Sequence, residues 1–160
     1  MINVRIKIGD GAVQDTFDAH GLIYMKADNR TEAPIKKRDV TSYAEQPGEN
    51  TDPRTVQDAF DYKVTFIIDG QDKDLKRVCD VVAAFNEKLY TQTAGSGIRI
   101  YKAVTFYNDF KNVKIVGLPE PIAEPKEFRK SRNGHEFAQV EFTIRVSDPT
   151  KCDFNMNTDV

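Results

Sequence analysis

The sequence predicts a mainly β (α+β) fold: two packed antiparallel sheets or a partly open barrel, with one flanking α-helix at about residues 73–90. Several segments alternate apolar and polar residues, which is typical of half-buried strands. One segment instead repeats apolar residues at steps of three and four, which is typical of an amphipathic helix. At 160 residues the chain has the usual size of one domain, so residues 1–160 are predicted to form a single domain.

The first three predicted strands lie before residue 42. The opening strand alternates four apolar residues with polar ones and ends at Asp10-Gly11; the four are Ile2, Val4, Ile6 and Ile8. Residues 21–27 and 35–41 read as two more strands, and the polar run between them predicts a hairpin. The exposed face of the third strand is basic, which also discourages aggregation through a sheet edge.

A long polar loop over residues 42–58 follows the basic strand, and it contains Pro47-Gly48 and Asp52-Pro53. Loops of this length inside a compact domain are usually functional or mobile. The next strand, residues 62–68, carries bulky apolar residues on one face and Ile67 on the other. We therefore expect it to be a central strand.

The single predicted helix begins after Asp72, a suitable N-cap, and runs to about Tyr90. Its apolar stripe is expected to cover a sheet, and it consists of Leu75, Val78, Cys79, Val82, Phe85 and Leu89. Cys79 is accordingly predicted to be a small core residue.

Three further strands are predicted at residues 98–107, 111–118 and 135–147. The proline-rich segment after Leu118 is not expected to continue a regular ladder, because proline lacks a backbone donor. The tail, residues 148–160, looks irregular and is expected to be loosely held.

No catalytic, metal-binding or cofactor-binding constellation is recognisable. His20 and His135 belong to no ligand motif, and the two cysteines, Cys79 and Cys152, form no disulfide framework, so a reducing intracellular setting is expected. The net charge of −2 gives no reason to expect nucleic acid or an anionic membrane as partner. No apolar run is long enough for a signal peptide or a membrane span.

Two non-catalytic roles therefore compete. The long loop has no visible chemistry, so we hypothesise that it is an assembly element that packs across a subunit boundary. The alternative is a β-sandwich module that binds a glycan through Tyr101, Tyr107 and Phe110. Phe106, Tyr107 and Phe110 lie near one predicted turn, where a packed hairpin core is favoured over a sugar platform.

A family resemblance favours assembly. The following segments succeed one another along the chain: Arg38-Asp39-Val40, Pro47 to Asn50, Asp61 to Ile68, the helix from Leu75 to Leu89, and strands at residues 111–117 and 140–146. Together they resemble the N-terminal domain of distal tail proteins of long-tailed bacteriophages. The resemblance implies a β-sandwich with a flanking helix that forms a hexameric ring in the virion tail. It also implies a structural phage or prophage protein, made in the bacterial cytoplasm, that contacts other tail proteins and has no catalytic residue. A tube or terminator subunit remains an alternative position in the tail.

Closing a ring needs two different complementary patches on each subunit. The basic strand and the acidic loop could supply them. The predicted subunit contacts are Lys36, Lys37, Arg38, Tyr43, Glu45, Arg54 and Asp58.

Overall fold

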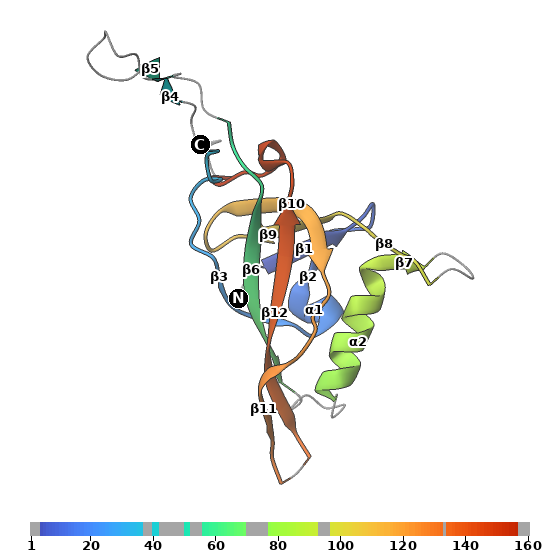
Figure 1. Ribbon diagram of the computed structural model, residues 1–160. Helices are drawn as coiled ribbons and strands as arrows, with labels where there is room; N and C mark the ends of the chain where they lie inside the picture. Colours follow the sequence, from blue (N-terminus) through green and yellow to red (C-terminus); the bar gives the residue numbers. More distant parts are fainter. Residues whose placement is uncertain are drawn as a thin grey trace.

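The computed structural model describes residues 4–36, 40–41, 50–51, 56–69, 77–92, 97–132 and 134–156. Within these residues the chain forms one open antiparallel sheet of eight strands, two separate two-stranded pairs and two short α-helices (Figure 1). The prediction of a mainly β fold with a flanking helix is confirmed.

The eight strands follow the order β2-β1-β9-β10-β12-β6-β3, and β11 pairs with β12 beside this path. They are β1 (Val4–Ile8), β2 (Gln14–Asp15), β3 (Ile23–Ala27), β6 (Phe60–Asp69), β9 (Val104–Asn108), β10 (Val113–Glu120), β11 (Lys126–Lys130) and β12 (Glu136–Val146). The longest ladder joins β6 to β12, from Phe60 opposite Val146 to Asp69 opposite Phe137. Because β6 pairs with both β12 and β3, it is an interior strand, as its partly apolar second face predicts, although only the edge strand β3 lies beyond it.

Strand β10 makes the sheet continuous. Its first part, Val113 to Gly117, pairs with β9, whereas Leu118 to Glu120 pairs with β12. Gly117 lies at this exchange, where a Cβ atom would be 2.4 Å from the Arg145 carbonyl oxygen. The expectation that the proline-rich segment supplies no ladder is wrong as far as Glu120, because Pro119 takes a place in the ladder opposite Ile144.

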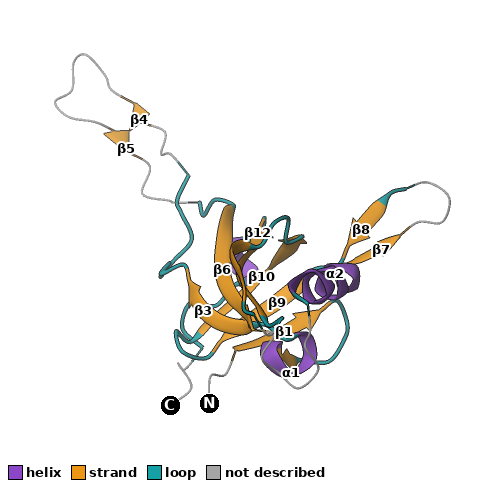
Figure 2. Ribbon diagram, turned by 90° about the horizontal axis from the view of Figure 1, so that it is seen from below, coloured by secondary structure: helices purple, strands orange, loops and turns teal. Residues whose placement is uncertain are grey.

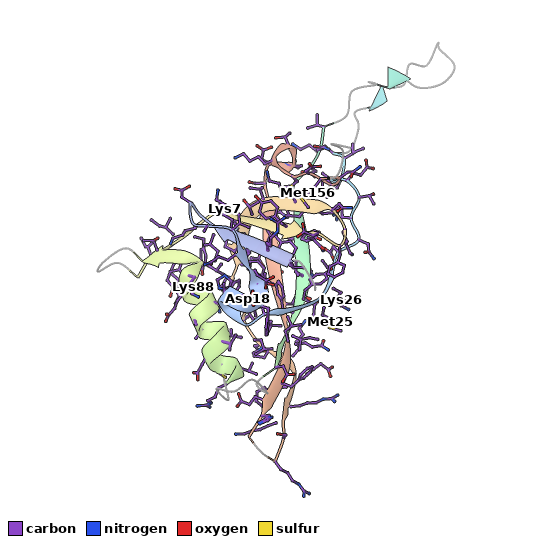
Figure 3. All side chains as sticks on the ribbon, turned by 180° about the vertical axis from the view of Figure 1, so that it is seen from behind. Lys7, Asp18, Met25, Lys26, Lys88 and Met156 are labelled. Atoms are coloured by element: carbon purple, nitrogen blue, oxygen red, sulfur yellow. The ribbon has the colours of Figure 1, made fainter. Side chains whose placement is uncertain are left out.

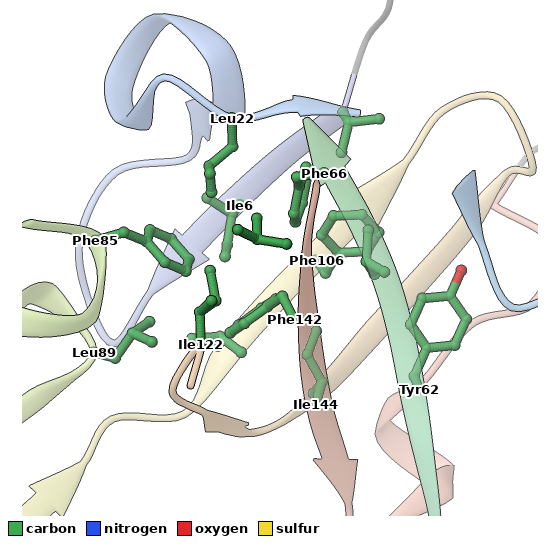
Figure 4. Packing of buried hydrophobic residues seen from close by; sticks show 14 of the residues in the cluster. Ile6, Leu22, Tyr62, Phe66, Phe85, Leu89, Phe106, Ile122, Phe142 and Ile144 are labelled. Atoms are coloured by element: carbon green, nitrogen blue, oxygen red, sulfur yellow. The ribbon is translucent and has the colours of Figure 1, made fainter. Parts of the chain in front are cut away.

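The core lies between the two halves of the sheet (Figure 4). The Phe106 ring on β9 packs against the rings of Tyr62 and Phe66 on β6, with centroid separations of 6.2 and 6.3 Å. Alternate residues of β6 and β12 are buried, as their period of two predicts. The sequence predicted either two packed sheets or a partly open barrel. The observed open sheet corresponds to the second of these.

Helix α2 (Val78–Lys88) covers one side of the core through Phe85, whose ring lies 5.3 Å from that of Phe142 on β12. Its buried stripe is Val78, Val81, Val82, Phe85 and Leu89. Cys79 is exposed, so its predicted burial is wrong: steps of three and four from Val78 reach Val81 and Val82 and leave Cys79 to one side. The helix begins at Val78, after the extended Arg77, and so later than the predicted start at about residue 73; Asp72 itself lies outside the described residues. No helix in the described part of the chain has the length and apolarity of a membrane span.

The N-terminus of α2 is capped by a residue that is distant in the sequence. Arg77 occupies the N-cap position without a side-chain hydrogen bond to the helix. Instead, the backbone N–H of Val78 donates to Glu136 Oε2 at 2.8 Å, and Glu136 is buried. This carboxylate on β12 satisfies a helix donor that would otherwise lack a partner.

Several short elements escaped the sequence prediction. Helix α1 (Thr16–His20) is capped by Asp15, whose side chain accepts from the N–H groups of Phe17 and Asp18, and by Gly21 with φ 71°. The strand predicted over residues 98–107 divides into β8 (Arg99–Tyr101) and β9, and β8 pairs with β7 (Tyr90–Gln92) outside the main sheet. Strand β11 was not predicted, because all its side chains are exposed and show no alternation.

The C-terminal segment is attached to the sheet as far as Met156, contrary to the expectation of a loosely held tail. A 3-10 turn, η1 (Pro149–Lys151), leads to a bridge between Asp153 and Lys114 on β10. The Met156 N–H donates to the Asn112 carbonyl at 2.8 Å, and the Phe154 ring packs on Phe60. These contacts were not readable from the irregular sequence.

Candidate assembly surface

The two ends of the stretch 34–58 pair with each other. Ile35 forms a bridge with Gln57, and the Lys36 N–H donates to the Val56 carbonyl at 2.8 Å. Farther along, β4 (Val40–Thr41) pairs with β5 (Asn50–Thr51). We call residues 34–36, 40–41, 50–51 and 56–58 the arm.

The arm corrects two predictions. Residues 35–41 do not form a hairpin with 21–27, because β3 pairs with β6 instead. The segment 42–58 is not wholly a loop, since Asn50, Thr51 and Gln57 pair with the first side of the arm. The physical reason is the antiparallel pairing of β3 and β6: the chain leaving β3 and the chain entering β6 lie at the same end of the sheet, so they meet and pair with each other.

The base of the arm is held firmly by the sheet. Asp28 links to β6 twice, since its N–H donates to the Lys63 carbonyl and its carboxylate accepts from the Lys63 N–H, at 3.0 and 3.1 Å. The guanidinium of Arg30 lies 4.7 Å from the centroid of the Phe60 ring. Ala33 and Phe60 are both buried. The arm therefore leaves the sheet from a packed base.

The arm exposes apolar side chains that its own subunit does not cover. Ile35 is 50% exposed and Val56 is 60% exposed. Figures 1 and 2 show β4 and β5 away from the main sheet. The two side chains lie on opposite faces of the arm, because Ile35 is opposite Gln57 and Val56 is opposite Lys36 in the antiparallel pairing. Each face of the arm therefore presents one exposed apolar residue to solvent.

The structure describes two of the seven predicted contact residues, Lys36 and Asp58, and both are exposed on the arm. The Asp58 N–H donates to the Pro34 carbonyl at 2.6 Å, and its carboxylate accepts from the Ala59 N–H. The others lie outside the described residues: Lys37, Arg38, Tyr43, Glu45 and Arg54.

A second projecting hairpin, β7–β8, was missed by the sequence analysis. Ile98 and Ile100 are each 59% exposed there. The rings of Tyr90 and Tyr101 pack at 5.6 Å, and the Arg99 guanidinium lies over Tyr90 at 4.4 Å. The alternation of Ile98 and Ile100 indicates a strand correctly, but it gives no sign that the apolar face is uncovered.

The histidines and cysteines lie apart from one another in the fold. His20 is buried between α1 and α2, with Nδ1 3.5 Å from Lys88 Nζ, and burial together with Lys88 lowers its pKa to about 4. His135 lies in the β11–β12 turn. Burial raises the pKa of the Cys152 thiol, which packs beside β10. The described residues include no cluster of three or more His, Cys, Asp or Glu side chains that could hold a metal.

The aromatic residues considered for glycan binding do not form one platform. Tyr101 packs on Tyr90, and Tyr107 lies beneath the Arg5 guanidinium at 4.9 Å. Phe110 is 57% exposed and stacks on Tyr24 with a centroid separation of 5.8 Å. Phe106 is fully buried, as expected for a hairpin core.

No protein-family model and no curated protein sequence matches this chain. The fold and the exposed surfaces are therefore the features from which a function follows.

Proposed function

We propose that this chain is a structural subunit of a bacteriophage or prophage tail, of the distal-tail type, which self-assembles into a ring. The observation that carries the proposal is the arm: a paired element that leaves the sheet from a packed base and exposes Ile35 and Val56. The mainly β body with a helix on one side agrees with the plan that the sequence resemblance implies. In this role the chain acts through its shape and contacts, without catalysis.

The energetics favour an intermolecular role for the arm. Fully burying an aliphatic side chain of this size contributes about 1.5–3 kcal/mol relative to full exposure. Ile35 and Val56 are 50% and 60% exposed, so covering each in a subunit contact gains roughly half of that amount. Their backbones are already ordered by the pairing of Lys36 with Val56, so association costs less conformational entropy than it would for a free loop.

The test is the oligomeric state of the purified protein, measured by size-exclusion chromatography with light scattering at two salt concentrations. We expect a closed species of about six subunits, the number that the family resemblance implies, with cyclic symmetry. The double variant Ile35→Asp/Val56→Asp should be monomeric with an unchanged circular dichroism spectrum, because both side chains are exposed. The control Leu118→Asp, at a residue 49% exposed on β10, should still assemble. A wild-type protein that stays monomeric at all concentrations would contradict the proposal.

The position within the tail has a separate readout. Electron microscopy of the assembled protein distinguishes a single ring, expected for a distal-tail or terminator subunit, from a stack of rings, expected for a tube subunit. Co-purification with the neighbouring tail proteins then identifies which end of the tail the ring contacts.

The glycan-binding alternative draws support from one residue, the exposed and stacked Phe110. It predicts a monomer that binds bacterial surface polysaccharide and loses that binding in Phe110→Ala. A ring whose assembly is unaffected by Phe110→Ala, with no polysaccharide binding by calorimetry, would exclude it.

A further inference from the structure

A small apolar pocket lies between α1 and the start of β3. It encloses about 400 Å³. Its walls are mainly apolar side chains and backbone, and its lining residues are Asp15, Thr16, Phe17, Asp18, Leu22, Ile23 and Tyr24. Leu22 at this site is fully buried, whereas Phe17 is 51% exposed. The pocket therefore combines a closed floor with an aromatic ring that is only half covered.

The pocket continues into an edge of the main sheet. Strand β3 ends the strand order, and β6 is its one ladder partner among the described residues. Met25, at the register shift between Tyr24 and Lys26, is 43% exposed (Figure 3). An open strand edge beside an apolar pocket is a surface to which another segment can add, with pockets receiving its alternate side chains. We call Phe17, Asp18, Met25 and the pocket the acceptor.

We propose that the acceptor binds the arm of a second copy of this chain, with Val56 entering the pocket beside Phe17. This inference rests on the proposed function, and it adds the surface that receives the arm. Each subunit then has one arm and one acceptor, which are different patches that fit each other.

Charge complementarity supports a second copy as the occupant. Lys36 lies next to Ile35 and is exposed on the arm. Asp15 and Asp18 line the pocket, and Asp18 is exposed. Lys36 lies opposite Val56 and shares its face of the arm, so an arm inserted through Val56 brings a cation to a rim that carries two carboxylates. Opposite charges across an interface increase the association rate and fix the orientation.

Within one subunit the arm lies away from the acceptor. The pocket includes Leu22, Ile23 and Tyr24 at the start of β3, whereas the arm follows Ala27 at its end. The five residues of β3 separate the two ends by roughly 13 Å at about 3.3 Å per residue, and the arm extends away from the sheet (Figures 1 and 2). This separation favours a contact between subunits, and a contact of one subunit's arm with another's acceptor is heterologous, the kind that closes rings.

The first test compares two aromatic variants at residues of similar exposure. Phe17→Asp places a charge in the acceptor, and Phe128→Asp places one on β11, where Phe128 is 49% exposed. We expect Phe17→Asp to raise the concentration for half-assembly by at least about tenfold and Phe128→Asp to leave it unchanged. Circular dichroism checks that both variants fold.

A charge exchange keeps the inference testable if Phe17→Asp does not fold. Asp18→Lys and Lys36→Asp should each weaken assembly, and the double variant should recover it, because the pair is then reversed. Direct proximity is tested by mixing Phe17→Cys and Val56→Cys proteins, both in a Cys79→Ser background because Cys79 is exposed. Mild oxidation should give a cross-linked dimer on a non-reducing gel.

The outcomes separate this inference from the proposed function. A wild-type ring that is insensitive to Phe17→Asp and to the charge exchange, and that gives no cross-link, overturns the acceptor and leaves the ring proposal standing. A wild-type monomer overturns both. Assembly that is lost in Phe17→Asp, restored by the charge exchange and trapped by the cross-link supports the acceptor.

Discussion

Gly117 is predicted to be the position on β10 where a single added methyl group damages the fold. A Cβ atom there would lie 2.4 Å from the Arg145 carbonyl oxygen, 2.8 Å from Ile144 Cγ2 and 2.9 Å from the Arg145 carbonyl carbon. Two of these neighbours are backbone atoms of β12, which the β6–β12 ladder holds in place. The clash cannot be relieved by rotating a side chain alone, so a strand must shift.

The magnitude follows from this rigidity. Overpacking a well-filled site costs about 1–3 kcal/mol and sometimes more. Because the β10–β12 ladder is confined to Leu118, Pro119 and Glu120, a shift of β10 also weakens the join between the halves of the sheet. We expect Gly117→Ala to lower the free energy of unfolding by roughly 3 kcal/mol or more, out of the 5–15 kcal/mol typical of a domain.

The assay is urea unfolding followed by far-ultraviolet circular dichroism. Gly134→Ala is the control: Gly134 has φ 82°, and an added Cβ would meet nothing within 4 Å. That variant should lose only the cost of a left-handed conformation, about 1–2 kcal/mol. If Gly117→Ala lowers the free energy of unfolding by no more than the control does, the close approach of β10 to β12 is not the reason for glycine at residue 117.

Three further predictions concern contacts with α2 and α1. Asn86→Ala removes both hydrogen bonds to the Ile122 backbone, at 2.9 and 3.0 Å, and should cost about 1–3 kcal/mol in urea unfolding. A loss below about 0.5 kcal/mol would show that water replaces the amide without penalty. Glu136→Ala leaves the Val78 N–H without its acceptor and should cost a similar amount, whereas Glu136→Gln keeps an acceptor oxygen and should lose less. For His20 the folded pKa of about 4 lies below the ordinary 6.5, so the unfolded chain binds the proton first. Stability should therefore fall by roughly 2–3 kcal/mol as pH drops from about 6.5 to about 4. His20→Leu should remove this part of the pH dependence and His135→Gln should keep it; equal profiles for wild type and His20→Leu would refute the assignment.

The elements that the sequence predicts well are those in which burial alternates regularly. In β6 and β12 the apolar residues recur at every second position and the core lies on one side, so the period identifies both strands. Helix α2 is recognisable from its three- and four-residue steps. The error at Cys79 arises because Cys79 and Val78 are adjacent apolar residues, and the sequence does not show which neighbour faces the sheet.

The features that the sequence does not predict depend on contacts between distant residues. Residues 35–41 could pair with residues 21–27 or with the chain entering β6, and the choice depends on which strand β3 joins. That strand, β6, lies about 40 positions farther along the sequence. Helix α1 has a capping Asp15 and a terminal Gly21, but its five residues are too few to show a helical period. The pocket beside Phe17 exists only because α1 packs against β3, so no spacing in the sequence marks it.

In the proposed ring, the direction of assembly would follow from one antiparallel pairing. Because β3 pairs with β6, the arm leaves the sheet at the end of β3 while the proposed acceptor lies at its start. A contact between these two patches uses a different patch on each partner, so an open chain of subunits keeps one free arm at one end and one free acceptor at the other until the ring closes. The angle between neighbours is then set by how the arm leaves its base, where Arg30 packs on Phe60 and Asp28 is bonded to β6. The same buried contacts that stabilise one subunit would therefore determine whether successive subunits close into a ring or continue as a filament.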